Sequence, residues 1–121
     1  MSKDSLTETN KLLKDFAINR DWEKFHSPKN LAMALSGECG ELLEHFQWLT
    51  EQESLQIDDA KKQEVAFEMA DILIYLIRLS ERLDIDLISS VEKKMAINEK
   101  RFPIEVVKGK ARRADEYSQN K

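Results

Sequence analysis

The chain has 121 residues, with 23 Asp or Glu against 19 Lys or Arg and a formal net charge of −4. This length fits one domain with a single modest core, and the negative balance disfavours a DNA- or RNA-binding protein, because such binding depends on neutralising many phosphates. Only 3 Gly and 2 Pro interrupt a sequence rich in helix-forming residues, so the composition predicts an all-α fold.

The apolar spacing predicts four main helices in chain order. They cover residues 6–20, 28–48, 59–83 and 87–102, and a short aromatic stretch at residues 21–26 follows the first. The third helix is apolar nearly all round in its middle, which a monomer of this size buries with difficulty. We therefore expect a homo-oligomer in which that helix is packed on both sides.

Polar residues with capping preferences mark where three of these helices begin. Ser27 is a suitable N-cap and Pro28 a suitable first helical residue for the second helix. Asp58 or Asp59 caps the third helix, and Asp86 caps the fourth. The expected architecture is a four-to-five-helix bundle whose core is completed by oligomerisation.

The sequence predicts one domain followed by a tail, and neither a signal peptide nor a membrane span. Residues 1–106 form the predicted domain, and residues 107–121 a charged, flexible C-terminal tail. The N-terminus has no apolar run of the kind found in a signal peptide. The longest apolar segment, residues 72–77, is far shorter than the roughly 20 residues of a membrane span. Together with a single cysteine, which is typical of a reducing compartment, these features predict a cytoplasmic protein without a membrane partner.

Two pairs of acidic residues lie inside apolar, helix-periodic stretches. Glu38 and Glu41 are in the second predicted helix, and Glu68 and Asp71 in the third. Acids three residues apart share one helix face, so an antiparallel arrangement brings the two pairs together. Carboxylates that converge repel one another by roughly 3 kcal/mol per close pair at an effective dielectric near 20, unless a cation lies between them or some are protonated. Ligands that are all oxygen favour Mg²⁺, or Mn²⁺, over zinc.

Two other interpretations of these acids are weaker. Each acid taken alone is more simply a surface charge, but charge inside an apolar stripe is costly unless it is paired or liganded. A di-iron or di-manganese bundle needs two Glu-x-x-His elements on core helices. Only Glu23 with His26 has this spacing, and the pair lies outside the long helices.

Two glycines flank the first acidic pair. Gly37 and Gly40 each destabilise a helix by about 1 kcal/mol relative to Ala, so their presence needs an explanation. We expect a neighbouring helix or a ligand to approach closely there.

Further residues suit a nucleotide. Lys94, Asn98 and Arg101 share one face of the fourth helix and can grip phosphate oxygens, although spacing alone favours a solvated cationic stripe. Aromatic side chains can stack on a base, although singly they more often belong to a core. The aromatic candidates are Trp22, Phe25 and Trp48.

These motifs resemble the all-α nucleoside triphosphate pyrophosphohydrolases, the MazG-like family. Residues 37–48 and 68–76 are similar to its Glu-x-x-Glu and Glu-x-x-Asp motifs, and the 26 residues between the pairs fit its usual gap. Residues 20–26, 46–48 and 94–103 are similar to segments of its dCTP pyrophosphatase branch.

The resemblance implies hydrolysis of a (deoxy)nucleoside triphosphate, dCTP or a modified dCTP, to the monophosphate and pyrophosphate, in control or cleansing of the nucleotide pool. It implies Mg²⁺ held by both acidic pairs, with Glu41 or Glu38 as the general base. Members of this family form dimers, and the dCTP branch forms tetramers as dimers of dimers. The implied nucleotide-binding residues are Trp22, Phe25, His26, Trp48, Tyr75, Lys94, Asn98 and Arg101.

Base preference and catalysis stay open at this point. Some dCTP-preferring relatives have a pocket histidine where this chain has Leu13. The competing class is a non-catalytic nucleotide-sensing or helical interaction module, because one misplaced water is enough to lose catalysis. A plain structural bundle is third, and it should gain no thermal stability from Mg²⁺ plus nucleotide.

Overall fold

A computed structural model describes residues 5–118. No strand occurs in this range, so the predicted all-α class is confirmed. None of the described helices is both long and apolar enough to cross a membrane. The helices are α1 (Ser5–Asn19), the 3-10 helix η1 (Glu23–Phe25), α2 (Pro28–Glu44), α3 (Glu51–Ser54), α4 (Asp59–Arg82), α5 (Leu87–Arg101), α6 (Ile104–Val107) and α7 (Ala114–Ser118).

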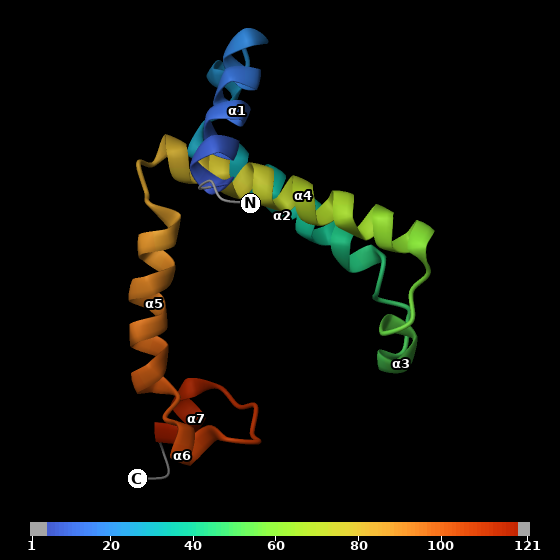
Figure 1. Cartoon of the computed structure of the whole chain (residues 1–121), viewed down its shortest axis with the longest axis vertical. Helices are drawn as coiled ribbons and strands as arrows, with labels where there is room; N and C mark the ends of the chain where they lie inside the picture. Colours follow the sequence, from blue (N-terminus) through green and yellow to red (C-terminus); the bar gives the residue numbers. More distant parts are fainter. Residues whose placement is uncertain (1–4, 119–121) are drawn as a thin grey trace. The chain divides into compact units, whose positions relative to one another are not determined.

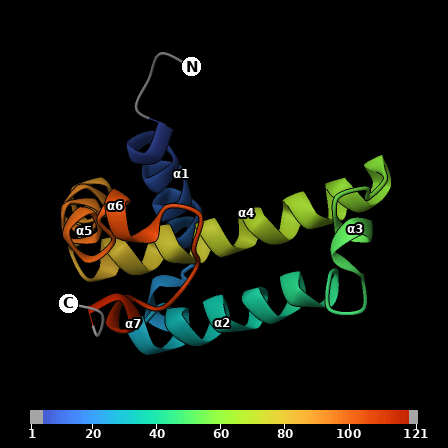
Figure 2. The same cartoon turned by 90° about the horizontal axis from the view of Figure 1, so that it is seen from below.

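The chain divides into two compact units between Ile85 and Asp86. In the first unit, α2 and α4 run antiparallel and side by side, and α3 lies at the end where the chain turns from one to the other (Figures 1 and 2). The helix α1 packs against α4. Apolar residues from all three helices are at most 7% exposed and form the core of this unit: Ala17, Leu31, Val65 and Ile77.

The predicted helix starts are confirmed by the capping contacts. The side chains of Ser27, Asp58 and Asp86 each accept a hydrogen bond from the backbone N–H three residues later, at 2.8 to 3.1 Å. Pro28 is the first residue of α2. Each of these side chains satisfies one of the backbone donors that a helix N-terminus leaves unpaired.

The region between α2 and α4 is more structured than predicted. The helix α2 ends at Glu44, four residues before the expected end, and the short helix α3 lies inside the expected loop. A capping box begins α3, since the Glu53 carboxylate accepts from the Thr50 N–H at 2.8 Å and the Thr50 hydroxyl accepts from the Glu53 N–H at 3.1 Å.

In the second unit, α6 and α7 lie together beyond the C-terminal end of α5 (Figure 1). Tyr117 of α7 is buried, its ring contacts Phe102 edge-on at a centroid distance of 6.0 Å, and its hydroxyl accepts a hydrogen bond from the Arg112 N–H at 2.7 Å. The expected tail, residues 107–121, therefore includes a short helix that contacts Phe102, and its flexibility stays a prediction. Residues 119–121 of that tail lie outside the described part of the chain.

Candidate active site

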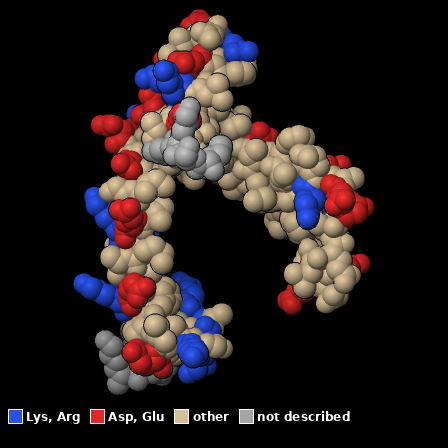
Figure 3. Space-filling model, viewed as in Figure 1, with Lys and Arg blue, Asp and Glu red and all other residues tan. Residues whose placement is uncertain are grey.

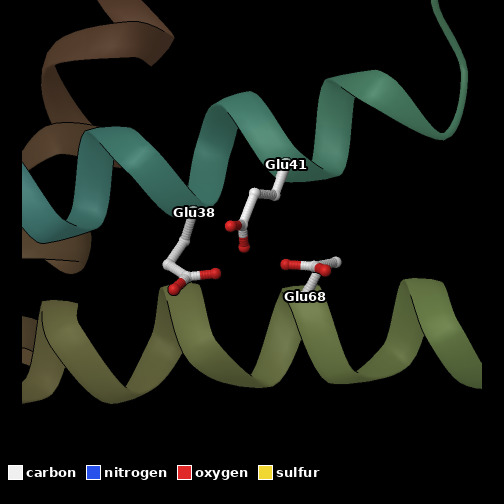
Figure 4. A group of neighbouring side chains, drawn as sticks. All are labelled: Glu38, Glu41 and Glu68. Carbon is white, nitrogen blue, oxygen red and sulfur yellow. The ribbon is translucent and has the colours of Figure 1, made fainter.

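Three carboxylates meet between α2 and α4. Glu38 and Glu41 point from α2 toward Glu68 of α4 (Figure 4). One ligand oxygen from each residue lies within 4.8 Å of the other two. The antiparallel packing of the two helices therefore brings together three of the four predicted metal ligands.

Asp71, the fourth predicted ligand, lies three residues further along α4 than Glu68 and is half-buried. It is not part of the close group of three carboxylates. Its negative charge nevertheless acts on that group, because it helps to raise the pKa of Glu38. Asp71 is thus an electrostatic neighbour of the cluster.

The proximity of these acids changes the protonation of Glu38. A hydrogen bond with Glu41, burial, the negative charges of Glu41 and Asp71, and a hydrogen bond with Glu68 raise the pKa of Glu38 from 4.5 to about 7. Near neutral pH, Glu38 therefore holds a proton for a large part of the time. This shared proton relieves the repulsion within the cluster.

The same carboxylates fit a hard divalent cation. Within residues 5–118, one oxygen of Glu38 and one of Glu68 are buried without a hydrogen-bond partner, and a buried acceptor without a partner is costly. All three residues offer oxygen, the ligand that Mg²⁺ and Mn²⁺ prefer. A cation at this point would displace the proton on Glu38 and satisfy both buried oxygens.

His45 is a neighbour of this cluster that the sequence analysis did not assign. Its side chain is only 16% exposed, with Nε2 3.8 Å from Glu68 Oε1 and Nδ1 4.0 Å from Glu64 Oε2. These distances are too long for hydrogen bonds. His45 follows Glu41 by four residues, so helical spacing was the available signal that it lies near the acidic face.

Two of the predicted base-contacting aromatics lie on or beside η1. Trp22 and Phe25 are 44% and 58% exposed. The ring of Trp22 contacts Phe16 edge-on at 5.7 Å, and its backbone N–H donates to the Ala17 carbonyl at 2.9 Å. The carbonyl of Phe25 accepts from the Asn30 side chain at 3.0 Å. Contacts with α1 and α2 therefore hold both ends of this stretch.

His26, at the end of the same stretch, is half-buried, and its Nδ1 atom is buried with no hydrogen-bond partner in the described part of the chain. Burial, followed by the positive charges of Arg78 and Arg82, lowers its pKa, while the charge of Glu23 acts in the opposite direction. Burial and these positive charges both favour the neutral form of His26.

The remaining predicted pocket residues lie on α4 and after α2. Tyr75 follows Asp71 by four residues, so it lies on the same side of α4, and it is half-buried. Trp48, in the turn after α2, is 86% exposed. Other described residues therefore cover little of the Trp48 side chain.

The predicted phosphate-binding residues belong to α5 of the second unit. Lys94 and Arg101 are exposed and Asn98 is half-buried, and helical spacing places the three on one face. The Arg101 guanidinium lies 5.6 Å from the centroid of the Phe102 ring. Their contact with a triphosphate stays a prediction.

Comparison with known proteins identifies the family. The chain is 40% identical over 114 residues to dCTP pyrophosphatase 1 of Homo sapiens, which covers 93% of this chain and 67% of that protein. It is 41% identical over 112 residues to dCTP pyrophosphatase 1 of Bos taurus, which covers 91% of this chain and 66% of that protein. The chain spans about two thirds of the length of these curated relatives.

A solved structure and a family model agree with this result. The crystal structure of a pyrophosphatase from Archaeoglobus fulgidus DSM 4304 is similar with a TM-score of 0.79 and 39% identity, over 85% of this chain and 96% of that chain. The model of the MazG-like family matches residues 33–116, which include both acidic pairs. Because this match covers more than half of the sequence, the chain belongs to the MazG-like family.

Proposed function

We propose that this protein is a nucleoside triphosphate pyrophosphohydrolase that converts dCTP or a modified dCTP to the monophosphate and pyrophosphate. The observation that carries the proposal is the group formed by Glu38, Glu41 and Glu68 between α2 and α4, all within the residues that the family model matches. Relatives named dCTP pyrophosphatase, similar over more than nine tenths of this chain, support the cytosine nucleotide. The corresponding role is control or cleansing of the nucleotide pool.

The cation that we propose for this site is Mg²⁺, with Mn²⁺ as a possible replacement. Glu38, Glu41 and Glu68 would hold it, and the nearby Asp71 would complete the set. When bound, such a cation supplies positive charge for the phosphate oxygens and for an attacking water. The two unpartnered carboxylate oxygens support this assignment.

The carboxylates also supply the proton acceptor for the reaction. Water would attack the α-phosphorus, forming a new P–O bond while the bond to the pyrophosphate oxygen breaks in line, and a carboxylate would take the proton. Glu41 is the proposed base, because it is exposed at the edge of the cluster and can reach both the other ligands and a water. Glu38 is the second candidate, because it lies beside Glu41 in the same group of carboxylates.

The nucleotide would contact two groups of residues, the aromatic residues through its base and the basic face of α5 through its triphosphate. Half-exposed aromatic rings beside η1 support stacking on the base, and the common face of the basic residues supports contact with the triphosphate. The proposed base-binding residues are Trp22, Phe25, His26, Trp48 and Tyr75, and the proposed phosphate-binding residues are Lys94, Asn98 and Arg101.

We also propose a homo-oligomer, either a dimer or a tetramer built as a dimer of dimers. A Cβ atom added at Gly37 or Gly40 would meet nothing within 4 Å, so no element of the described chain accounts for these glycines. On α4, Phe67, Met69 and Leu73 are 63%, 57% and 47% exposed. In Figure 3, uncharged side chains cover much of the visible face of the α2–α4 pair, and charged ones gather where α4 begins. Further copies packed against α4 would cover these apolar residues. Sedimentation velocity would measure the resulting oligomeric state directly.

A cytoplasmic location, without DNA, RNA or membrane partners, completes the proposal. The net charge of −4 supports the absence of a nucleic-acid partner. The single cysteine, Cys39, is a free thiol, which supports a reducing compartment.

The experiment that tests the function is release of pyrophosphate and monophosphate from canonical and 5-modified dNTPs and NTPs, with Mg²⁺ and with chelator. We expect Mg²⁺-dependent release that is strongest for dCTP or its analogues. Release with another base preference would support the proposed reaction and contradict the preference for cytosine. The residues assigned to base binding would then be revised, beginning at Leu13. Mg²⁺-dependent binding with no release from any triphosphate would instead favour the non-catalytic nucleotide-sensing module.

A further inference from the structure

Arg78 of α4 is a buried cation that the proposed chemistry does not use. Its side chain is 2% exposed, and it is among the largest fully buried side chains of the described chain. It follows Asp71 by seven residues, which is two turns along the same side of α4. Burying a charge is costly unless the charge is paired, so its partners indicate why it is there.

The guanidinium of Arg78 has one carboxylate partner on its own helix and one on η1. Its Nη1 atom lies 3.3 Å from Glu81 Oε2, and its Nη2 atom lies 3.6 Å from Glu23 Oε1. Glu81 also forms an ion pair with Lys14 of α1 at 3.1 Å. The Nε and Nη2 atoms of Arg78 have no hydrogen-bond partner in the described residues. Pairing with two carboxylates therefore compensates this buried charge only in part.

The contact with Glu23 joins two parts of the proposed site. Glu23 lies between Trp22 and Phe25, and the backbone contacts of this stretch tie it to α1 and α2. Among the ion pairs of residues 5–118, the one that ties the stretch to α4 is Glu23 with Arg78. The charge of Arg78 also reaches His26, whose pKa it helps to lower.

We propose that Arg78 is a positioning residue that, through Glu23, sets how the aromatic stretch at residues 22–26 lies against α4 and thereby fixes the binding of the nucleotide base. The helix α4 also carries Glu68 and Asp71, so the same helix orients both the base and the carboxylates. The inference rests on the proposed function, because the base-binding role of the aromatic stretch does.

The test compares the two carboxylate partners of the same guanidinium. Glu23→Gln keeps the side-chain shape and removes the charge that ties the aromatic stretch to α4. We expect KM for dCTP to rise about tenfold or more while kcat stays within about twofold, because base binding is disturbed and the carboxylate cluster is not. The matched control is Glu81→Gln, which removes the other partner of Arg78 and should lower Tm with KM within about twofold of wild type.

Variants of Arg78 separate positioning from general stability. Arg78→Lys keeps a positive charge and should restore part of the affinity that Arg78→Met loses. If Arg78 acts through Glu23, the double variant Arg78→Met with Glu23→Gln should raise KM no further than Arg78→Met alone. A KM for Glu23→Gln equal to that of wild type would overturn the proposal, and so would an equal rise for Glu81→Gln.

A second readout does not depend on turnover. In a Trp48→Phe background, acrylamide quenching reports on Trp22 alone, since the chain contains 2 Trp. We expect quenching to increase in Glu23→Gln and to stay unchanged in Glu81→Gln. If the wild-type protein hydrolyses no triphosphate, the proposed function fails, and the quenching still decides the positioning role: an unchanged value in Glu23→Gln would refute it.

Discussion

Replacing Glu38 by Gln should change how the stability of the metal-free protein depends on pH. The pKa of Glu38 is raised from 4.5 to about 7, so the folded protein binds a proton more tightly than the unfolded chain does. This contribution to the free energy of unfolding is fully present below about pH 4.5 and is lost as the pH rises through about 7. The Gln variant lacks the titrating group and therefore lacks this contribution.

The magnitude follows from the size of the pKa difference. A difference of about 2.5 units corresponds to a ceiling of about 3 kcal/mol, at about 1.4 kcal/mol per unit. Glu38 is only half-buried, and solvent screening reduces the expected effect to about 1 kcal/mol. Relative to Glu38→Gln, the wild-type protein should thus lose about 1 kcal/mol of stability between about pH 5 and pH 8.

The assay is urea unfolding followed by circular dichroism, with chelator present, for both proteins across this pH range. His26 titrates in both proteins, so its contribution cancels in the difference between them. The difference in the free energy of unfolding between the two proteins could instead stay constant with pH, or change in favour of the wild type as the pH rises. Either result would show that the folded protein does not bind a proton at Glu38 more tightly than the unfolded chain does. The proximity of Glu41 and Glu68 would then not raise the pKa of Glu38.

Three further results are expected. Glu41→Gln or Asp71→Asn should reduce pyrophosphate release by a factor of about 100 or more, since each removes a proposed ligand, while circular dichroism shows an unchanged helical protein. The Tm of the metal-free variants should be equal to or higher than that of the wild type, because repulsion between the carboxylates falls. Near wild-type activity in either variant would show that the site assignment is wrong. Chelator should abolish pyrophosphate release, and Mg²⁺ should restore it. The affinity for Mg²⁺ should increase as the pH rises through about 7, because binding displaces a proton. Calorimetry in two buffers of different ionisation enthalpy measures the number of protons released. Leu31→Ala should lower the free energy of unfolding, measured with urea, by about 2–5 kcal/mol, because Leu31 lies in the core and is 1% exposed. Leu55→Ala should lower it far less, because Leu55 is 79% exposed. Equal losses of stability would contradict the packing described for α2.

Local features of the sequence were sufficient to predict the four long helices. Ser27, Asp58 and Asp86 marked three helix starts correctly, because capping depends on residues only a few positions apart. The capping box at Thr50 was equally local, and its pattern was present in the sequence although α3 was not predicted. The end of α2 was placed four residues too late, because its apolar periodicity continues into the turn that follows.

The sequence by itself determined the all-α class, the family and the two acidic pairs, because helical periodicity and motif spacing are properties of neighbouring residues. Only the tertiary structure brings Glu38 close enough to Glu41 and Glu68 for its pKa to be raised, since this depends on how closely α2 and α4 pack. In the same way, Glu23 and Arg78 are 55 residues apart, and no local pattern pairs them. Electrostatic energy depends on distance in space and on burial, and both are decided only when the helices pack together.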